Sequence, residues 1–223
     1  MADWSRVGIV VGLTAEARLV RVLGGPVAVG GGTADGARQA AERLVASGAR
    51  ALVSIGLAGG LDPSMRPGHV LVPEAVLHRE QSFVTDDELR LMLGGATPHR
   101  LLGAGRVVAH VAEKRAFWRH TGCAAVDLES GAVAQHAADM GLPFAVLRVI
   151  CDPGHRELPP ASLVALGPDG RISVQAILRS IIRQPSQISA LVMLAADAIR
   201  ARKRLRDHLR RITAGASNSG EPQ

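Results

Sequence analysis

The sequence contains few aromatic residues and few cysteines. It has no tyrosine, and aromatic residues make up 2% of its 223 residues, so the core must be built from valine, leucine, isoleucine and alanine. Proteins that bind single-stranded nucleic acid use aromatic side chains as stacking platforms, and this composition argues against that function. The two cysteines, Cys123 and Cys151, predict no disulfide framework, and no Cys/His cluster has the spacing of a zinc site. We therefore expect no metal and no other cofactor.

Long apolar runs and a recognisable leader are also lacking. No apolar run approaches the roughly 18 residues of a membrane-spanning helix, and residues 1–12 lack the basic region and cleavage site of a signal peptide. We therefore expect the chain to stay in the cytoplasm. The formal net charge is +6, but much of the excess lies in residues 200–211. Because the charge belongs to one segment rather than to the whole surface, we expect no nucleic-acid partner.

What the sequence does contain is an alternation of short apolar stretches and helical patterns. Residues 7–11, 27–29 and 51–55 have the length and composition of buried strands, and amphipathic segments with acidic first turns lie between them. This alternation predicts a three-layer α/β/α fold with a central, mixed, largely parallel sheet. Further expectations are strands at 68–77, 101–103 and 107–111, a glycine loop at 56–60, and helices at 86–93, 113–120 and 172–182.

The length suits one α/β domain. We expect this domain to span residues 1–185, with a helix at 186–212 that belongs to it and a small, polar, disordered tail at 213–223. The helix carries one apolar stripe with basic residues beside it, which allows two interpretations. Either residues 200–211 contact anionic lipid head groups, or the stripe packs on the domain and leaves a solvated basic edge. The stripe is formed by Ile188, Leu191, Ala195, Ala198, Leu205, Leu209 and Ile212.

Residues 125–152 contain the densest pattern in the chain. Their first half predicts a helix that delivers an acid at its start, with Asp127 and Ser130 both plausible as the N-cap. Gly141 and Pro143 end this helix. Glu129 is thereby expected at the helix start.

The second half of this stretch predicts a buried strand. Residues 144–150 form an apolar run, typical of a strand covered on both faces, and only Arg148 interrupts it. If Arg148 is buried, it needs a partner, most simply a carboxylate or carbonyl groups. Asp152 follows just past the carboxyl end of the strand, where open α/β sheets place ligands. Glu129 and Asp152 are therefore candidates for one crevice.

Three motifs in this order resemble the nucleoside phosphorylase and nucleosidase superfamily. They are VGIVVGLTAEARLV at residues 7–20, SIGLAGGLDP at 54–63 with GHVLVP downstream, and VDLESGAVAQHAADMGLPFAVLRVICD at 126–152. The closer likeness is to the branch that includes methylthioadenosine/S-adenosylhomocysteine nucleosidase. Any one motif alone would be weak, whereas the three together are specific. The resemblance implies an enzyme that cleaves the N-glycosidic bond of a purine nucleoside.

The resemblance also implies roles for three carboxylates. Asp152 would give or share a proton with N7 of the departing adenine, and its apolar flanks would raise its pKa. Glu129 would bind the ribose hydroxyls, and Glu16 would activate the attacking water. Each acid also has a simpler structural explanation. Asp152 would cap the loop before Pro153, and the two glutamates would be first-turn acids that interact with a helix dipole.

Other positions are implied to line the substrate site. Residues 58–60 match the loop around the sugar in relatives. Leu128 stands where methionine is usual, beside the acid that binds ribose. Two valines stand where relatives carry an aromatic residue that stacks on the purine, which predicts a more aliphatic base pocket. These candidate binding residues are Ala58, Gly59, Gly60, Leu128, Val107 and Val108.

A narrower likeness is to the hopanoid-associated members of this superfamily. It is carried by RVICDPGHRELPP at 148–160, the PDGR turn at 168–171 and QPSQISALVMLAADAI at 184–199. It implies hydrolytic release of adenine from adenosylhopane. Residues 79–99 and 153–160 are the expected walls around the apolar 5′ group. The alternatives are a phosphate-dependent phosphorylase with Arg18 as a phosphate ligand, a methylthioadenosine/S-adenosylhomocysteine nucleosidase, and a non-catalytic nucleoside- or lipid-binding module. We also expect a homo-oligomer.

Overall fold

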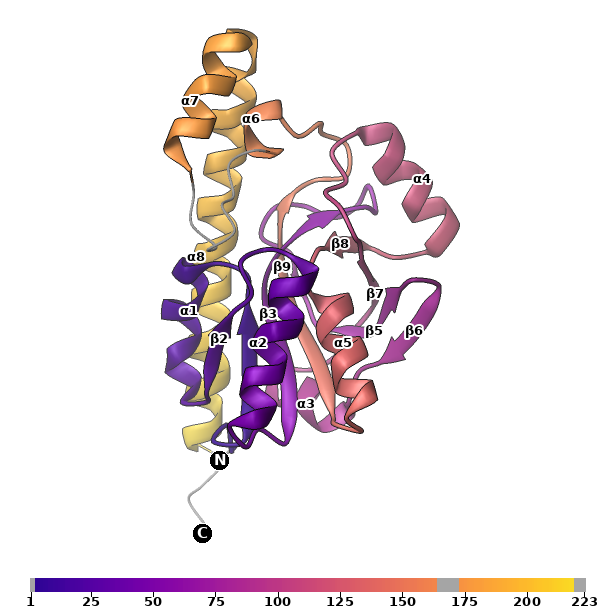
Figure 1. Ribbon diagram of the computed structural model, residues 1–223, viewed down its shortest axis with the longest axis vertical. Helices are drawn as coiled ribbons and strands as arrows, with labels where there is room; N and C mark the ends of the chain where they lie inside the picture. Colours follow the sequence, from indigo (N-terminus) through magenta and orange to yellow (C-terminus); the bar gives the residue numbers. More distant parts are fainter. Residues whose placement is uncertain (1–2, 164–172, 219–223) are drawn as a thin grey trace.

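A computed structural model describes residues 3–163 and 173–218, in which nine strands form one curled sheet with helices on both faces (Figure 1). The strands are β1 (Val7–Val11), β2 (Val27–Val29), β3 (Ala51–Gly60), β4 (Val70–Leu71), β5 (Pro73–His78), β6 (Gln81–Val84), β7 (Thr97–Gly103), β8 (Ala125–Asp127) and β9 (Phe144–Asp152). The helices are α1 (Thr14–Val20), α2 (Ala34–Ala46), α3 (Asp87–Met92), α4 (Val111–Thr121), α5 (Ser130–Asp139), α6 (Pro160–Leu163), α7 (Val174–Arg183) and α8 (Ile188–Asn218), with 3₁₀ turns η1 (Arg21–Leu23) and η2 (Pro185–Gln187). The PDGR turn expected at 168–171 lies outside the described residues.

The sheet is largely parallel. Its order is β2-β1-β3-β8-β7-β5-β6, and β9 pairs with both β3 and β4. The pairs β1-β2, β1-β3, β3-β9, β5-β7 and β7-β8 are parallel, while β3-β8, β4-β9 and β5-β6 are antiparallel. β3 is the central strand, because residues 51–55 pair with β1 on one side and residues 52–59 pair with β9 on the other. The predicted α/β fold with a largely parallel sheet is confirmed.

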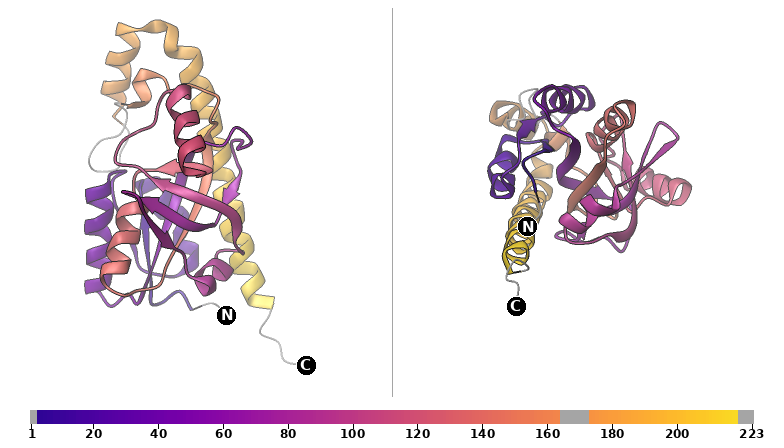
Figure 2. Two further views of the ribbon diagram at one scale, coloured as in Figure 1. Left: turned by 90° about the vertical axis from the view of Figure 1, so that its right-hand side faces the viewer. Right: turned by 90° about the horizontal axis from the view of Figure 1, so that it is seen from below.

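The layers follow from the alternation of side chains along the buried strands. Val10 of β1 packs with α2 and α5, whereas its neighbours Ile9 and Val11 pack with α1 and α8. Because successive side chains of a strand point to opposite faces, a strand covered on both faces must be apolar throughout. Figure 2 shows the result, with α2 and α5 on one side of the sheet and α8 on the other.

The expected glycine loop at 56–60 is wrong, because β3 continues through these residues to Gly60. Their backbone is used in pairing with β9 and, at the end of the strand, with β8. The glycines are needed because buried polar side chains approach this strand closely. A Cβ at Gly56 would lie 3.2 Å from Nη1 of Arg148, and a Cβ at Gly59 would lie 2.9 Å from Oδ1 of Asp152.

Three shorter elements also differ from expectation. Residues 125–127 form β8 rather than the start of a helix, because they pair with β7, and the helix begins only at Ser130. Residues 107–110 form no strand and connect β7 to α4. The strand β6 was not predicted, and it pairs with β5 in a hairpin whose turn residues Arg79 and Glu80 both have positive φ, 48° and 66°.

The C-terminal helix is longer than predicted. It runs to Asn218, beyond the expected end at residue 212, while residues 219–223 lie outside the described residues. The helix continues because residues 186–221 contain no proline to interrupt it. Thr213 adds a local contact, since its hydroxyl donates to the carbonyl of Leu209 at 3.1 Å.

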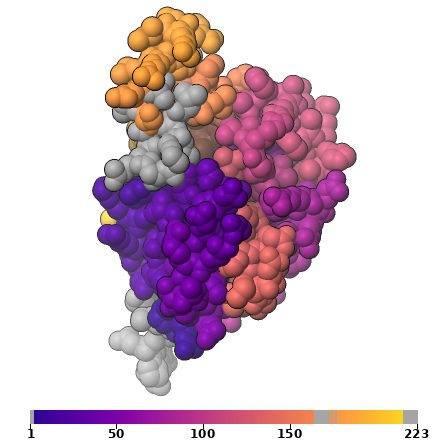
Figure 3. Space-filling model, viewed as in Figure 1, coloured from indigo at the N-terminus to yellow at the C-terminus, as the bar shows by residue number. Residues whose placement is uncertain are grey.

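The two halves of α8 differ in exposure. In the second half, Ala201, Leu205 and Leu209 are fully buried in the core shared with α1 and the sheet. The first half projects beyond the sheet together with α7, as Figures 1 and 3 show. None of the helices in residues 3–163 and 173–218 combines the length and the apolar character that a membrane span requires. The exposed apolar side chains of the projection are Leu178, Ile182, Ile188, Val192, Met193 and Ile199.

Candidate active site

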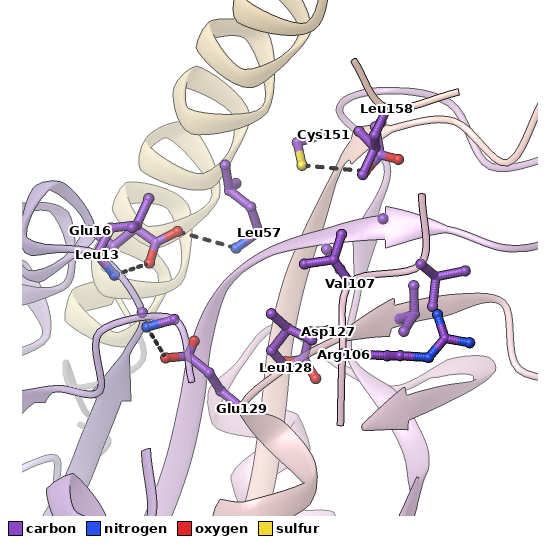
Figure 4. Close-up of a pocket in the computed structure, with 17 residues that line it drawn as sticks. Leu13, Glu16, Leu57, Arg106, Val107, Asp127, Leu128, Glu129, Cys151 and Leu158 are labelled. Atoms are coloured by element: carbon purple, nitrogen blue, oxygen red, sulfur yellow. Dashed lines mark hydrogen bonds between the residues drawn. The ribbon is translucent and has the colours of Figure 1, made fainter. Parts of the chain in front are cut away.

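A cavity of about 220 Å³ lies at the carboxyl ends of β1, β3, β8 and β9 (Figure 4). It brings together eight of the nine residues expected at the site. Gly60 is the exception, because a Cβ there would lie 3.1 Å from Cβ of Met65 and 3.2 Å from the backbone nitrogen of Gly154. Gly60 therefore packs against the turn after β9 and not against the cavity. The eight residues that line the cavity are Glu16, Ala58, Gly59, Val107, Val108, Leu128, Glu129 and Asp152.

Glu16 enters the cavity from the first turn of α1. Its Oε2 accepts a hydrogen bond from the backbone N–H of Leu13 at 2.9 Å, and its Oε1 accepts one from Leu57 at 3.3 Å. The carboxylate thereby closes the start of the helix and joins it to β3. The side chain is buried, which raises its pKa, while the two hydrogen bonds and the charges of Arg148 and Arg202 oppose the rise.

Glu129 lies at the start of α5, as expected, and it occupies the N-cap position that the sequence had assigned to Asp127 or Ser130. Its Oε1 accepts a hydrogen bond from the backbone N–H of Gly32, in the segment after β2, at 3.1 Å. Burial raises the pKa of Glu129 to about 8, against the opposing charge of Arg148 and with the support of the negative charges of Asp127 and Glu16. Burial thus moves the titration of this carboxyl toward neutral pH.

Asp152 ends β9 and forms a buried ion pair with Lys114 of α4. Burial raises the pKa of Asp152, and the ammonium group of Lys114 opposes the rise. The lysine also donates to the backbone carbonyls of Arg156 at 3.0 Å and Pro153 at 3.3 Å. Asp152, the acid expected to exchange a proton, is thus held by Lys114, a cation that was not predicted from the sequence.

A second buried ion pair, between Arg148 and Asp127, lies at the wall of the cavity. Arg148 of β9 is fully buried, and its Nε donates to Oδ2 of Asp127 at 2.6 Å. Its Nη2 donates to the hydroxyls of Ser54 at 2.7 Å and Ser130 at 3.0 Å. The prediction that a buried Arg148 would need a carboxylate partner is confirmed. Asp127 also accepts hydrogen bonds from the backbone and hydroxyl of Ser130, and so it fixes the start of α5.

The remaining walls of the cavity are mostly aliphatic. Val107 and Val108 come from the connection before α4, and Leu158 comes from the irregular segment after β9. These two segments are joined, because the backbone N–H of Leu158 donates to the carbonyl of Ala109 at 3.0 Å. Arg106 lies at the edge of the cavity and pairs with Glu113 of α4. The lining therefore combines apolar walls with a small set of acids.

The arrangement suits proton transfer around a bound polar molecule. Besides Asp127, which is paired with Arg148, the carboxyl groups of Glu16, Glu129 and Asp152 share one small cavity, and burial raises the pKa of each of these three. Titratable groups whose pKa values move toward neutrality in a cleft are typical of acid–base catalysis. In the part of the chain that the structure describes, no group of three or more His, Cys, Asp or Glu side chains is arranged to hold a metal ion.

Comparison with known proteins agrees with the fold. The family model of the Phosphorylase superfamily matches residues 9–101 and 100–183, well over half of the chain. The 5′-methylthioadenosine/S-adenosylhomocysteine nucleosidase of Mycobacterium bovis is 26% identical over 152 residues, which cover 47% of this chain and 60% of that protein. The match thus spans less than two thirds of this relative's length.

Two solved structures from Helicobacter pylori share the architecture. Futalosine hydrolase of strain 26695 superposes with a TM-score of 0.64 at 15% identity, covering 81% of this chain and 98% of that one. The 5′-methylthioadenosine/S-adenosylhomocysteine nucleosidase superposes with a TM-score of 0.64 at 14% identity, covering 94% and 100%. At these identities the likeness shows the fold alone.

Proposed function

The chain belongs to the phosphorylase superfamily, and from that premise we propose that it cleaves the N-glycosidic bond of a 5′-substituted adenosine and releases adenine. The observation that carries the proposal is the convergence of Glu16, Glu129 and Asp152 on one cavity. These acids are distant in the sequence, so their meeting is not a consequence of local structure. Acids on several sides of one bound sugar are what this reaction requires.

Cleavage of the bond needs a proton for the departing base and stabilisation of a sugar that becomes positively charged. Asp152 takes the first role and shares a proton with N7 of the adenine. Burial supports this role, because a carboxyl group whose pKa is raised transfers a proton more readily near neutral pH. Glu129 takes the second role and binds the ribose hydroxyls. Once ionised, its carboxylate favours the charge that develops on the sugar.

Water, rather than phosphate, is the proposed nucleophile. Glu16 activates it, since the acid is buried in the cavity and its pKa is raised. A phosphate site would need cations free to bind it, and Arg18 does not line this cavity. Of the described residues that do line it, Arg106 is the one cation, and it is already paired with Glu113. This distribution favours hydrolysis over phosphorolysis.

The apolar lining favours a large apolar group at the 5′ position, and we propose adenosylhopane as the substrate. Leu57 and Leu158 line the cavity beside the acids, and Leu158 belongs to the segment expected to form a wall of the 5′ subsite. Residues 79–99, the other expected wall, do not line this cavity. Methylthioadenosine is the alternative, since its small 5′ group needs less of this apolar surface.

A membrane-resident substrate gives the exposed apolar surface of α7 and the first half of α8 a function. The expected lipid contact through residues 200–211 is limited to their basic edge, because Ala201, Leu205 and Leu209 are buried. We propose that the projecting surface touches anionic lipid instead, since residues 173–196 carry Arg179 and Arg183 and no acidic residue.

Flotation with anionic vesicles tests this contact. Vesicle binding unchanged by Leu178→Ser/Ile182→Ser, or self-association of the chain through this surface, would contradict it.

Three expectations from the sequence remain proposals. We keep residues 1–185 and the helix at 186–212 as one domain, because Leu205 and Leu209 of α8 share a core with Ile9 of β1. We also keep a cytoplasmic location and a homo-oligomer. Light scattering at micromolar concentration measures the oligomeric state.

One experiment tests the proposed function against its alternatives. The chain is incubated with adenosylhopane or methylthioadenosine, with and without phosphate, and free adenine and the sugar product are measured. We expect adenine and a free ribosyl product without phosphate, at a higher kcat/KM for adenosylhopane. A sugar 1-phosphate would identify a phosphorylase. A binding module would release no adenine, and Asp152→Asn would change nothing.

A further inference from the structure

Lys114 is a buried cation on a helix that otherwise lies at the surface. Its side chain has no exposed area, whereas its neighbour Arg115 is exposed. The helix places Lys114 one turn before Phe117 and Trp118, which pack partly in the adjacent core. Burial of an ammonium group is costly unless it is paired and hydrogen-bonded. The groups that contact Lys114 must therefore offset the whole free-energy cost of burying its charge.

The contacts of Lys114 match the three hydrogens of an ammonium group. It pairs with Oδ2 of Asp152 and donates to the carbonyls of Pro153 and Arg156 at 3.3 and 3.0 Å. All three acceptors belong to the last residue of β9 and the turn that follows it. A neutral amine would have one hydrogen too few for this set, so the geometry favours the charged form.

We propose that Lys114 is the positioning residue for Asp152, which it ties to α4 through one carboxylate oxygen while the other oxygen remains available to the ligand. The inference rests on the proposed function, in which Asp152 exchanges a proton with the base. Oδ1 is this second oxygen, and it accepts only a long hydrogen bond from the thiol of Cys151, at 3.8 Å. Gly59 leaves the space beside Oδ1 open, because a Cβ there would lie 2.9 Å from this oxygen.

The charge of Lys114 also adjusts how strongly Asp152 holds its proton. Three groups face the carboxyl: Lys114 from α4, Arg156 from the turn, and the thiol of Cys151 from β9. Burial raises the pKa of Asp152, and Lys114 is the largest opposing influence. Without the lysine the acid form would persist to higher pH, but that acid would be weaker and would no longer be held in place. Loss of Lys114 should therefore lower kcat and move the alkaline limb of the pH profile upward.

The test measures the titration of Asp152 and the pH profile in the same variants. Lys114→Met removes the charge and keeps a similar length, Lys114→Arg keeps the charge, and Arg115→Met removes an exposed charge from the same helix. The carboxyl carbon of Asp152 is followed by NMR in the full chain labelled at aspartate, and Asp152→Asn assigns its resonance. If Lys114→Met does not fold, Lys114→Gln takes its place, because it retains two hydrogen-bond donors.

The expected result is a coupled change in both measurements. In Lys114→Met the titration of Asp152 moves upward by about 1–3 pH units, and the alkaline limb of kcat/KM for adenine release moves with it. The kcat falls by about 10–100-fold, while Arg115→Met behaves as the wild type and Lys114→Arg keeps the limb in place. In an Asp152→Asn background, Lys114→Met costs little further activity, because Lys114 acts through Asp152.

Failure of this inference differs from failure of the proposed function. An Asp152 titration that is the same with and without Lys114 would overturn the inference, and so would a loss of activity with an unmoved alkaline limb. A shifted titration in a chain that releases no adenine from any nucleoside would support the control of Asp152 by Lys114 and overturn the nucleosidase.

Discussion

The carboxylate of Glu129 fills the space in which a side chain at Gly12 would lie. A Cβ at Gly12 would be 2.6 Å from Oε2 of Glu129, and a Cβ at Gly30 would be 2.9 Å from Oε1. Oε1 also accepts the hydrogen bond from the backbone of Gly32. The glycines that follow β1 and β2 thus form a socket that aims this acid into the cavity. Neither Gly12 nor Gly30 has a positive φ, so close approach, and not backbone conformation, explains them.

Gly12→Ala should displace Glu129 and impair catalysis. We expect adenine release to fall by about 10²-fold, because a displacement of about 1 Å in a positioning group has that effect. The melting temperature should change little, since the added methyl group meets a side chain that can move. Gly105→Ala is the matched control, because a Cβ there meets no atom within 4 Å. Wild-type activity in Gly12→Ala would show that Glu129 need not occupy this socket.

The stability of the protein should depend on pH through Glu129. Its pKa of about 8 in the folded chain exceeds the usual 4.5, so between these values the folded state holds a proton that the unfolded state has released. The free energy of unfolding therefore decreases as the pH rises through this window, by roughly 5 kcal/mol at most. Glu129→Gln does not titrate and should be more stable than the wild type at pH 9, by several kcal/mol, with a smaller difference at pH 5.

Urea denaturation at pH 5, 7 and 9 measures this dependence. Glu74→Gln provides the control, because Glu74 is an exposed carboxylate on β5. If the stability difference between Glu129→Gln and the wild type is the same at all three pH values, the carboxyl is already ionised at low pH. Burial would then not control its protonation.

Much of the fold and site followed from local sequence patterns. Apolar runs of strand length identified β1, β2 and β9, because a strand covered on both faces needs apolar residues throughout. The helix expected at 86–93 is α3, and the carboxylate of Asp86 caps it by accepting the N–H of Leu89 at 2.9 Å. The position of Asp152 followed from the rule that ligands bind at the carboxyl ends of parallel strands. The cavity placement of Glu16 followed from the family motif rather than from its own surroundings.

The features that were missed depend on contacts between distant segments. Lys114 lies in a helical pattern typical of a solvated surface, and only the fold brings it to Asp152, 38 residues further on. Its position one turn before Phe117 indicates the buried face, but Phe117 and Trp118 alone do not identify the partner. The three residues of β8 are too few to show periodicity, and pairing with β7 decides their conformation.

Arg148→Met should destabilise the protein strongly. The substitution leaves the carboxylate of Asp127 buried without its cation, and loss of one partner of a buried ion pair costs about 3–5 kcal/mol. The double variant Asp127→Asn/Arg148→Met should lose less than the sum of the single variants, because neither charge is left alone. Urea denaturation measures these differences, with Arg119→Met, at an exposed position of α4, as the control. Additive losses would mean that the two residues contribute independently.

Glu16→Gln should separate catalysis from binding. The amide keeps one acceptor oxygen for the N–H of Leu13 or Leu57, so we expect a stability loss of only about 1 kcal/mol. It cannot take a proton from water, and the rate of hydrolysis should fall by about 10²–10⁴-fold. Adenine binding, measured by calorimetry, should change little, and Glu42→Gln on the surface of α2 serves as the control. If Glu16→Gln hydrolyses the substrate at the wild-type rate, a group other than Glu16 activates the water. Since Glu129 and Asp152 are assigned to the sugar and the base, that group would be a fourth one.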